Sequence, residues 1–261
     1  MTTTLEILRP SAHVAEVWLN RPDVRNAFND GVIAELTDAF RTLGADPELR
    51  AIVLGGRGKA FCAGADLSWM RSMADFTWDQ NRGDASALAE MLWTLWQCPV
   101  PLVGRVHGDC YAGGVGLAAV CDVLVAAEGV GFCLSEAKLG LLPATIGPYV
   151  VRALGEQASR RYFVTAERFN AERAHTLGFV HEVVPAAQLD AKVAEIVTTL
   201  VANGPAAVKA CKQLVKDVAG HAIDASLRDD TARRIANIRV SPEGREGVQS
   251  FLNKREPNWR T

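Results

Sequence analysis

The sequence predicts an α/β fold in which short β–β–α turns stack around one core and a helical region follows. The middle of the chain repeats strand, helix and strand with connections of a few residues, a pattern typical of stacked turns rather than of two wound halves. After Leu141 the chain becomes mainly helical, and prolines punctuate it. A chain of 261 residues is long enough for one large domain or for a core with a small appendage.

The composition disfavours several classes of partner. Apolar residues make up 49% of the chain, charged residues make up 22%, and the formal net charge is −2. These values are typical of a globular protein, and the short basic clusters do not favour nucleic acid or an anionic membrane as a partner. The first residues show no charged stretch followed by an apolar one, and no apolar run reaches the ~18 residues of a membrane span. We therefore expect neither a signal peptide nor a membrane anchor.

The cysteines predict a reducing compartment. None of the six stands in a C-x-x-C pair: Cys62, Cys98, Cys110, Cys121, Cys133 and Cys211. Most have apolar neighbours, as reduced thiols in a core do, and the Cys and His spacing is too wide for a zinc site. We expect a cytoplasmic protein without a bound metal.

Periodicity predicts the order of the elements. Alternating or β-branched runs predict strands at 13–19, 50–54, 100–106, 122–126, 131–134 and 180–184. Helical spacing predicts helices at 29–43, 85–97, 113–120, 187–203, 205–219, 222–238 and 242–253. Residues 67–83 have no clean period, so a broken helix or loop that covers an apolar ligand and a plain surface helix both remain open. We divide the chain into a core at 1–195 and a C-terminal helical region at 196–261.

The first segment that carries chemical information runs from Ala60 to Leu67 and reads A-F-C-A-G-A-D-L. Its small residues leave the backbone N–H groups accessible, and Gly64 can adopt dihedral angles that are closed to other residues. Two such N–H groups brought together can hold a developing oxyanion. A strand-to-helix turn without a ligand is the alternative.

The second segment, residues 107–117, also follows a β-branched run. Gly113 and Gly114 open an apolar helix, and the first N–H groups of a helix have no partner within it. An anionic oxygen near Gly113 is therefore favoured, although a close helix-to-strand contact would also explain the glycines. Neither segment fits a phosphate-binding loop.

Glu136 follows the predicted strand at 131–134 and has apolar neighbours. Partial desolvation would raise the pKa of its carboxyl toward a range useful for proton transfer. The alternative is a solvated loop with Ser135 as a helix cap.

Together these segments resemble the crotonase superfamily, which has the enoyl-CoA hydratase/isomerase fold. The similarity runs along nearly the whole chain. It includes Asn20-Arg21-Pro22, Asn26-Ala27, residues 60–66, Val106-His107-Gly108, Gly113-Gly114, Cys121-Asp122, Ser135-Glu136, Leu139-Gly140-Leu141 and residues 251–257.

The resemblance implies a crotonase-like spiral of β–β–α turns with a helical C-terminal trimerisation region. The protein would form homotrimers, which often pair into hexamers. The N–H groups of Ala65 and Gly113 would bind the thioester oxygen of an acyl-CoA, and no cofactor beyond the substrate's own CoA would be needed. CoA itself would lie against Arg25, Lys59, Cys62, Ala63, Gly64, Ala65, Asp66 and Leu67, with Phe251 and Lys254 reaching it from a neighbouring subunit.

One position departs from the pattern of this superfamily. Hydratases with two catalytic glutamates carry the second one three positions after the oxyanion glycine, and this chain has Gly116 there. Only Glu136 is retained. A single carboxylate also suits double-bond isomerases, which move one proton between two carbons. Asp66 and Asp109 could assist, although a structural role is expected for Asp66.

The finer resemblance is to hydratases of branched 2-enoyl-CoAs that carry a distal carboxylate, such as 3-methylglutaconyl-CoA and isohexenylglutaconyl-CoA. It rests on residues 132–136, 141–144, 146–148, 161–163 and 165–169. Lys138, Arg71 and Arg152 are candidate partners for that carboxylate.

Three hypotheses follow. The first is hydration of an enoyl-CoA in leucine or acyclic isoprenoid breakdown, with Glu136 as the single catalytic carboxylate. The second is isomerisation of a 3-enoyl-CoA to a 2-enoyl-CoA. The third is a CoA-binding or RNA-associated relative without activity, although the near-neutral charge argues against strong RNA affinity.

Overall fold

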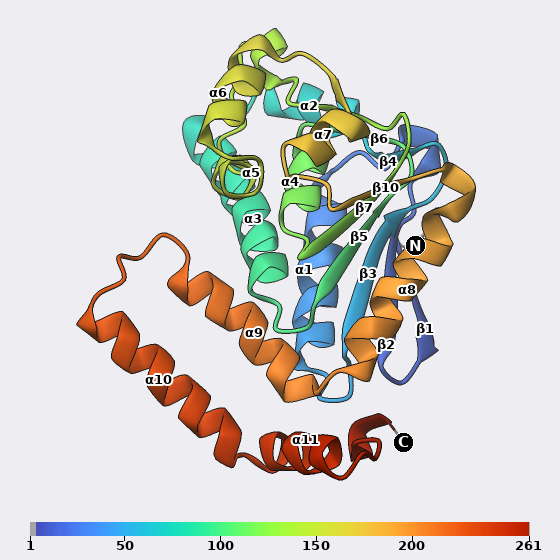
Figure 1. The fold of residues 1–261 in the computed structure, drawn as a ribbon. Coiled ribbons are helices and arrows are strands. Elements are labelled where there is room, and N and C mark those ends of the chain that lie inside the picture. Colours follow the sequence, from blue (N-terminus) through green and yellow to red (C-terminus); the bar gives the residue numbers. More distant parts are fainter. Residues whose placement is uncertain (1–3, 261) are drawn as a thin grey trace.

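Two β-sheets form the centre of the molecule. The computed structural model describes residues 4–260. The larger sheet has the order β1-β2-β3-β5-β7-β10, and β1 is its antiparallel edge strand (Figure 1). Its strands are β1 (Leu5–Ser11), β2 (Val14–Leu19), β3 (Ala51–Gly56), β5 (Leu102–Val106), β7 (Val123–Ala127) and β10 (Glu182–Val184). The fully buried run of β3, and β5 with only Arg105 half-buried, are typical of parallel strands covered on both faces.

The smaller sheet has the order β4-β6-β8-β9. Its strands are β4 (Ala60–Cys62), β6 (Asp109–Tyr111), β8 (Gly131–Cys133) and β9 (Phe169–Asn170). Successive pairs along the chain, β3 with β4, β5 with β6 and β7 with β8, each give one strand to the larger sheet and one to the smaller. This arrangement confirms the predicted spiral of β–β–α turns.

Helices cover the two sheets. Their bounds are α1 (Asp30–Ala45), α2 (Leu67–Met73), α3 (Trp78–Gln97), α4 (Gly113–Ala119), α5 (Gly147–Leu154), α6 (Glu156–Thr165), α7 (Ala171–Thr176) and α8 (Leu189–Ala202). Short 3-10 turns occur at η1 (Pro22–Val24), η2 (Glu136–Leu139), η3 (Ala186–Gln188) and η4 (Asn258–Arg260). Helix α8 packs on β3, β5 and β7, whereas α1 and α3 pack on each other on the opposite side (Figure 1).

The segment at 67–83 is helical at both ends. Asp66 caps α2 by accepting hydrogen bonds from the amides of Ser68 and Trp69, and a capping box at Thr77 starts α3. Leu67 and Trp78 are 71% and 72% exposed, whereas Trp69 packs against the core. This mixture of exposed and packed apolar side chains explains why the sequence showed no clean period.

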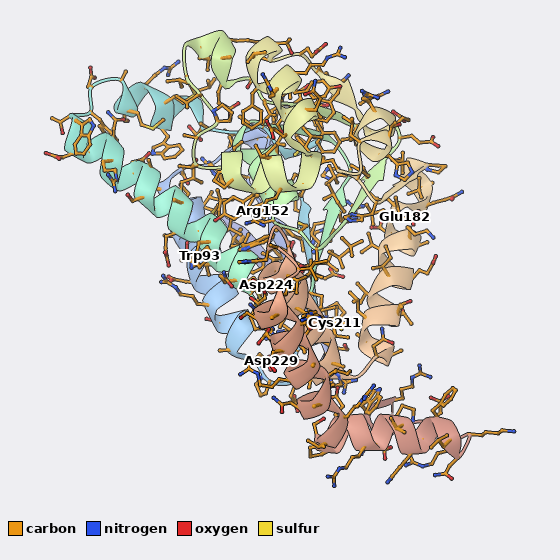
Figure 2. All side chains as sticks on the ribbon, turned by 60° about the vertical axis from the view of Figure 1, so that its left-hand side comes forward. Trp93, Arg152, Glu182, Cys211, Asp224 and Asp229 are labelled. Atoms are coloured by element: carbon orange, nitrogen blue, oxygen red, sulfur yellow. The ribbon has the colours of Figure 1, made fainter. Side chains whose placement is uncertain are left out.

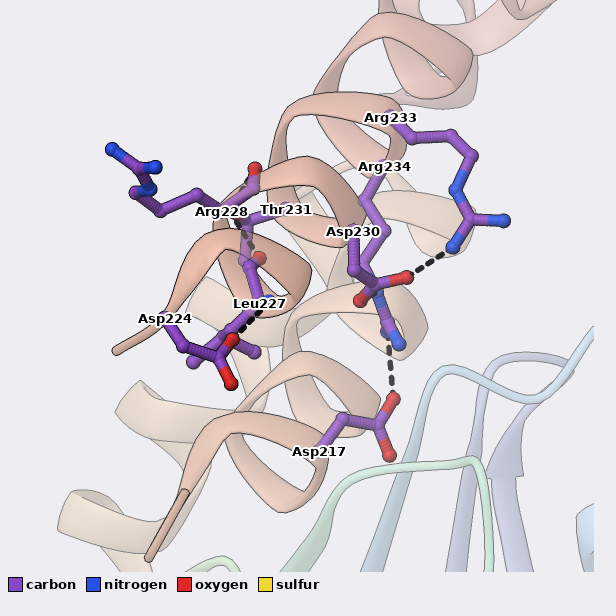
Figure 3. A network of polar contacts seen from close by, with 8 residues as sticks. All are labelled: Asp217, Asp224, Leu227, Arg228, Asp230, Thr231, Arg233 and Arg234. Atoms are coloured by element: carbon purple, nitrogen blue, oxygen red, sulfur yellow. Dashed lines mark hydrogen bonds and ion pairs between the residues drawn. The ribbon is translucent and has the colours of Figure 1, made fainter. Parts of the chain in front are cut away.

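Three C-terminal helices extend from the body as an arm (Figure 1). The first of them is tied to the body by Lys212, which pairs with Asp122 at 2.6 Å and donates to the Val100 carbonyl at 3.1 Å. They are α9 (Pro205–Val218), α10 (Ala225–Val240) and α11 (Pro242–Leu252). Neither α9 nor α10 contains a buried residue. Arg234 on α10 joins the two helices by an ion pair of 2.6 Å to Asp217 on α9, and it also pairs with Asp230 of its own helix at 2.6 Å (Figure 3). Exposed ion pairs contribute little to stability. Because α9 and α10 bury no residue, this arm has no core of its own in the single chain.

The predicted division after residue 195 falls inside α8. That helix buries Leu189 and Val193 against the core, and Ile196, Val197 and Leu200 also pack there. The change from packed body to projecting arm therefore comes after Ala202, where α8 ends.

Most predicted elements are confirmed with small shifts of their ends, but α3 begins at Trp78, seven residues before its predicted start at 85. Those that the sequence did not predict are β1, the short strands β4, β6 and β9, and the helices α5, α6 and α7. Within residues 4–260, no helix is long and apolar enough to cross a bilayer.

Candidate active site

The smaller sheet brings three predicted segments together. Strands β4, β6 and β8 are neighbours and run parallel, with Cys62 opposite Cys110 and Tyr111 opposite Cys133. The carboxyl ends of neighbouring parallel strands meet at one edge of a sheet. Residues 63–66, 112–114 and 134–136 follow these three ends directly, so they converge at that edge.

The amide of Ala65 is free of protein acceptors within the described part of the chain. Ala65 forms an isolated parallel bridge with Phe28. In that bridge the Phe28 amide donates to the Gly64 carbonyl at 2.6 Å, and the Asp66 amide donates to the Phe28 carbonyl at 2.7 Å. Successive N–H groups of an extended chain point to opposite sides. The Ala65 N–H therefore points away from Phe28.

The amide of Gly113 opens helix α4. The preceding residue, Ala112, donates its own amide to the Cys133 carbonyl at 2.8 Å and accepts from the Val115 amide at 2.9 Å. As the first residue of the helix, Gly113 has no intrahelical acceptor for its N–H group, and it has no other one among residues 4–260. Two unused backbone donors thus lie on adjacent loops of one sheet edge.

Close backbone contact holds these loops together. Gly64 has φ of 91°, and a Cβ built there would lie 2.9 Å from the Ala112 Cβ. A Cβ at Gly114 would lie 2.5 Å from the Cys62 carbonyl oxygen. Only glycine permits both approaches, which is the physical reason for the small residues in the two segments.

Ala112 has an unusual backbone conformation, with φ of 47° and ψ of −118°. An L-residue other than glycine rarely adopts this conformation, which costs on the order of 1–3 kcal/mol. The hydrogen bonds from Ala112 to Cys133 and Val115 hold it in place. Backbone strain is therefore stored at the residue that orients the Gly113 amide.

Glu136 starts the turn η2, three residues after β8. Its side chain is half-buried, and its Oε2 is a buried atom without a hydrogen-bond partner within the described residues. Burial raises the pKa of the Glu136 carboxyl, and only a hydrogen bond from its own backbone opposes this shift. A desolvated carboxylate with one buried oxygen unpaired is a candidate for a group that exchanges protons with a ligand.

Gly116 lies on α4 against Ile146. A Cβ built at Gly116 would lie 2.8 Å from the Ile146 Cβ, with Leu92 behind it, and Ile146 is only 2% exposed. A glutamate at position 116 would therefore require Ile146 to move. Position 116 therefore contributes an apolar contact, and no carboxylate, to this part of α4.

The other residues predicted to bind CoA lie in two places. Arg25 and Lys59 are exposed on loops beside residues 62–67, and the Arg25 carbonyl accepts from the Ala63 amide at 3.0 Å. The Cys62 side chain is fully buried, and burial raises the pKa of its thiol to about 12. Phe251 and Lys254 lie at the end of the arm, at the opposite end of the molecule from β4 and β6 (Figure 1). One chain therefore does not bring them to the site.

The candidate partners for a distal carboxylate are all exposed. Arg71 lies on α2, Lys138 on η2 and Arg152 on α5; Figure 2 labels Arg152. None of the three forms an ion pair within residues 4–260. In contrast, Asp109 lies at the start of β6, where its carboxylate pairs with Arg168 at 3.2 Å and accepts from the Tyr111 hydroxyl.

Sequence reasoning assigned no role to Arg21, Asn26, Phe28 or Ala112. Asn26 is 1% exposed and donates to the carbonyls of Arg57 and Ala60 at 2.8 and 2.9 Å, which fixes the loop after β2 against β4. The available signal in the sequence was an asparagine a few residues after the Asn20-Arg21-Pro22 segment, but the sequence does not show that this side chain is buried. The conformation of Ala112 has no signal in the sequence, because alanine does not mark a positive φ.

A cavity of about 710 Å³ lies elsewhere, between the larger sheet and α8. Trp18, Arg57, Arg105 and His107 line it, and no predicted site residue does. Within the described residues, no group of three or more His, Cys, Asp or Glu side chains could hold a metal ion.

The edge of the smaller sheet thus carries two backbone N–H donors, from Ala65 and Gly113, on loops next to the one that holds the desolvated Glu136 carboxylate. The model of the enoyl-CoA hydratase/isomerase family matches residues 9–261. The chain belongs to this family, within the crotonase superfamily.

Several known proteins are similar along nearly the whole chain. The structure of an enoyl-CoA hydratase from Shewanella pealeana is 39% identical, has a TM-score of 0.94, and covers 98% of this chain and 96% of its own. Enoyl-CoA hydratase ACTT6 of Alternaria alternata is 33% identical over 94% of this chain and 80% of its own length. The 2,3-dehydroadipyl-CoA hydratase of Escherichia coli is 29% identical over 97% of this chain and 98% of its own.

Replacing Ala112 with glycine should stabilise the protein. The change removes backbone strain of about 1–3 kcal/mol from the folded state. The more flexible glycine also stabilises the unfolded chain by about 0.4–1 kcal/mol, which offsets part of this gain. We expect the free energy of unfolding in urea to rise by roughly 1 kcal/mol. Ala39→Gly, within helix α1, is the control and should lower it by a similar amount. A loss of stability in Ala112→Gly equal to that of the control would contradict the assigned strain.

Proposed function

We propose that the protein is an enoyl-CoA hydratase that adds water across the 2,3 double bond of a branched, glutaconyl-type acyl-CoA. The observation that carries this proposal is the partnerless, buried Glu136 carboxylate oxygen at the sheet edge where the Ala65 and Gly113 amides are also unused. The names of the hydratase relatives support the reaction class.

In this proposal the thioester oxygen accepts hydrogen bonds from the Ala65 and Gly113 amides. Attack at C3 moves negative charge onto that oxygen as the enolate forms. Fixed donors aimed at such charge act strongly where water is excluded. The partial positive charge at the start of α4 adds to this stabilisation.

Glu136 acts on the water molecule. Its carboxylate removes one proton as the oxygen of the water bonds to C3, and C2 of the enolate then takes a proton from the carboxylic acid. The product gains one oxygen and two hydrogens, and Glu136 returns to its ionised form. One carboxylate serves both steps because Ile146 fills the space beside Gly116.

A distal carboxylate on the acyl chain is the finer part of the proposal. The 2,3-dehydroadipyl-CoA hydratase of Escherichia coli is named for an acyl chain that ends in a carboxylate. Arg71, Lys138 and Arg152 remain available on the surface around α2, η2 and α5. Such a substrate would arise in leucine or acyclic isoprenoid breakdown.

CoA binding would use more than one subunit. Arg25 and Lys59 would lie near the CoA phosphates, residues 62–66 would surround the adenine end, and Leu67 would also lie against CoA. Phe251, which is 83% exposed, and Lys254 would reach the nucleotide from the arm of a neighbouring subunit. We propose a homotrimer or a dimer of trimers in the cytoplasm, with no cofactor other than the CoA of the substrate. The six free cysteines favour a reducing compartment.

Glu136→Gln should abolish most hydration. The amide cannot take a proton from water, so we expect kcat to fall on the order of 10²-fold or more, with the KM for the acyl-CoA little changed. The assay is a mass increase of 18 in a panel of enoyl-CoA thioesters that includes 3-methylglutaconyl-CoA and crotonyl-CoA. Normal turnover by the variant would exclude Glu136 as the base, and tight CoA binding without turnover by the native chain would favour an inactive relative.

A second candidate reaction is the isomerisation of a 3-enoyl-CoA to a 2-enoyl-CoA. The single carboxylate favours it, because one base can move a proton between two carbons. The absorbance of the conjugated thioester separates the two reactions, since hydration removes it and isomerisation creates it.

The activity should fall in acid at a higher pH than for an ordinary glutamate. Burial raises the pKa of Glu136, and the proposed base must be ionised. As the pH falls through this raised pKa, the carboxylate takes up a proton and kcat/KM decreases. A profile of kcat/KM against pH should therefore have its acid limb above the usual glutamate range, and residual activity in Glu136→Gln should lack that limb. An acid limb at the ordinary value would argue against the assignment.

The arm should hold several chains together. Ile235 and Val240 on α10 are 47% and 62% exposed, and no core covers them in the single chain. Light scattering should give a mass that is a multiple of three times the chain mass of 28.1 kDa. Ile235→Asp with Val240→Asp should reduce it, whereas Val164→Asp, at a 77% exposed position on α6, should not. A monomeric native protein would contradict the assembly.

A further inference from the structure

A buried ion pair lies directly beside the residue that supplies the first free amide. The Arg21 Nη2 atom is 2.8 Å from the Asp66 Oδ2 atom, and their side chains are 22% and 9% exposed. Arg21 follows β2 in the chain, and Asp66 follows Ala65, so the pair joins two segments 45 positions apart.

The other amino group of the Arg21 guanidinium binds the segment on the Phe28 side of the Phe28–Ala65 bridge. The Arg21 Nη1 atom donates to the Ala27 carbonyl at 2.6 Å. Ala27 precedes Phe28, whose amide and carbonyl bond to Gly64 and Asp66. The Arg21 side chain thus closes a ring of hydrogen bonds through Asp66, Phe28 and Ala27. Ala65 lies directly beside this ring, which does not use its N–H group.

Asp66 uses both carboxylate oxygens within this ring. Oδ2 accepts from Arg21, whereas Oδ1 accepts from the amides of Ser68 at 2.8 Å and Trp69 at 3.4 Å, which start α2. Both oxygens of its carboxylate therefore accept hydrogen bonds from the protein, which disfavours a contact of this side chain with CoA. The cap of α2 and the ion pair with Arg21 can be tested separately, because asparagine caps a helix as well as aspartate does but carries no charge for Arg21.

We propose that Arg21 and Asp66 are positioning residues that aim the Ala65 amide at the thioester oxygen of the substrate. This inference rests on the proposed function of Ala65. Buried ion pairs add little net stability, since desolvation of the charges offsets their attraction. The geometric effect of this pair is larger, because a displacement of about 1 Å in a reacting group can lower a rate on the order of 10²-fold.

The test uses two variants in the full-length chain. Asp66→Asn keeps the cap of α2 and removes the charge pair, and Arg21→Lys keeps the positive charge but cannot reach both Asp66 and Ala27. We expect each to lower kcat about 10-fold or more while the KM stays within about threefold, because binding of the CoA portion is unchanged. Glu167→Gln is the matched control: it removes the exposed ion pair between Arg161 on α6 and Glu167 just after that helix, and it should leave kcat unchanged.

A spectroscopic probe reports the aim of the amide without turnover. The absorption of 4-(dimethylamino)cinnamoyl-CoA moves to longer wavelength when its carbonyl oxygen is polarised by hydrogen-bond donors. We expect this red shift with the native protein and the control, and a smaller shift with both variants at saturating probe. A purely structural role would lower the melting temperature and leave the shift and kcat of the folded protein intact.

The outcomes separate this inference from the proposed function. A native red shift and native kcat in either folded variant would overturn the positioning role. If the native protein shifts the probe but hydrates no enoyl-CoA, the hydratase proposal fails, and a reduced shift in the variants still supports the positioning role. No shift with the native protein would overturn both. If Asp66→Asn does not fold, Arg21→Lys decides alone.

Discussion

The parallel register of β4, β6 and β8 is the constraint on which the candidate site depends. Each strand has only three residues, yet their pairing sets three loops side by side at one edge. A shift of one residue in β6 would point Ala112 and Gly113 to the wrong side of the sheet. The larger sheet matters for function because β3, β5 and β7 lead directly into these short strands.

The site is assembled from groups that a purely structural region would not leave unpaired. Two backbone amides lack protein acceptors within the described residues, Glu136 has a buried oxygen without a partner, and Ala112 has a strained backbone. An unsatisfied buried polar group costs about 1–3 kcal/mol. The surrounding contacts, including the Arg21–Asp66 pair and the buried Asn26, hold these groups in place. Their concentration at one edge indicates where a ligand would complete the hydrogen bonding.

The fold class and the segments that lie side by side at the candidate site could be predicted, because both have local signals in the sequence. Helical spacing marked α1, and β-branched runs marked β3 and β5. The strands β4 and β6 are too short to show alternation, and β9 has two residues. Gly64 and Gly113 marked the loops, but the roles of Phe28 and Arg21 depend on partners more than 30 residues away in the chain. The contact of Gly116 with Ile146 could also not be predicted, because it joins α4 to the start of α5.

The most direct test of the account is a crystal structure of the protein with a bound acyl-CoA. The proposed mechanism predicts that the thioester oxygen lies within about 2.7–3.1 Å of both the Ala65 and Gly113 nitrogen atoms, with Glu136 facing C2 and C3. A complex in which this oxygen lies beyond hydrogen-bond distance of both amides would contradict it.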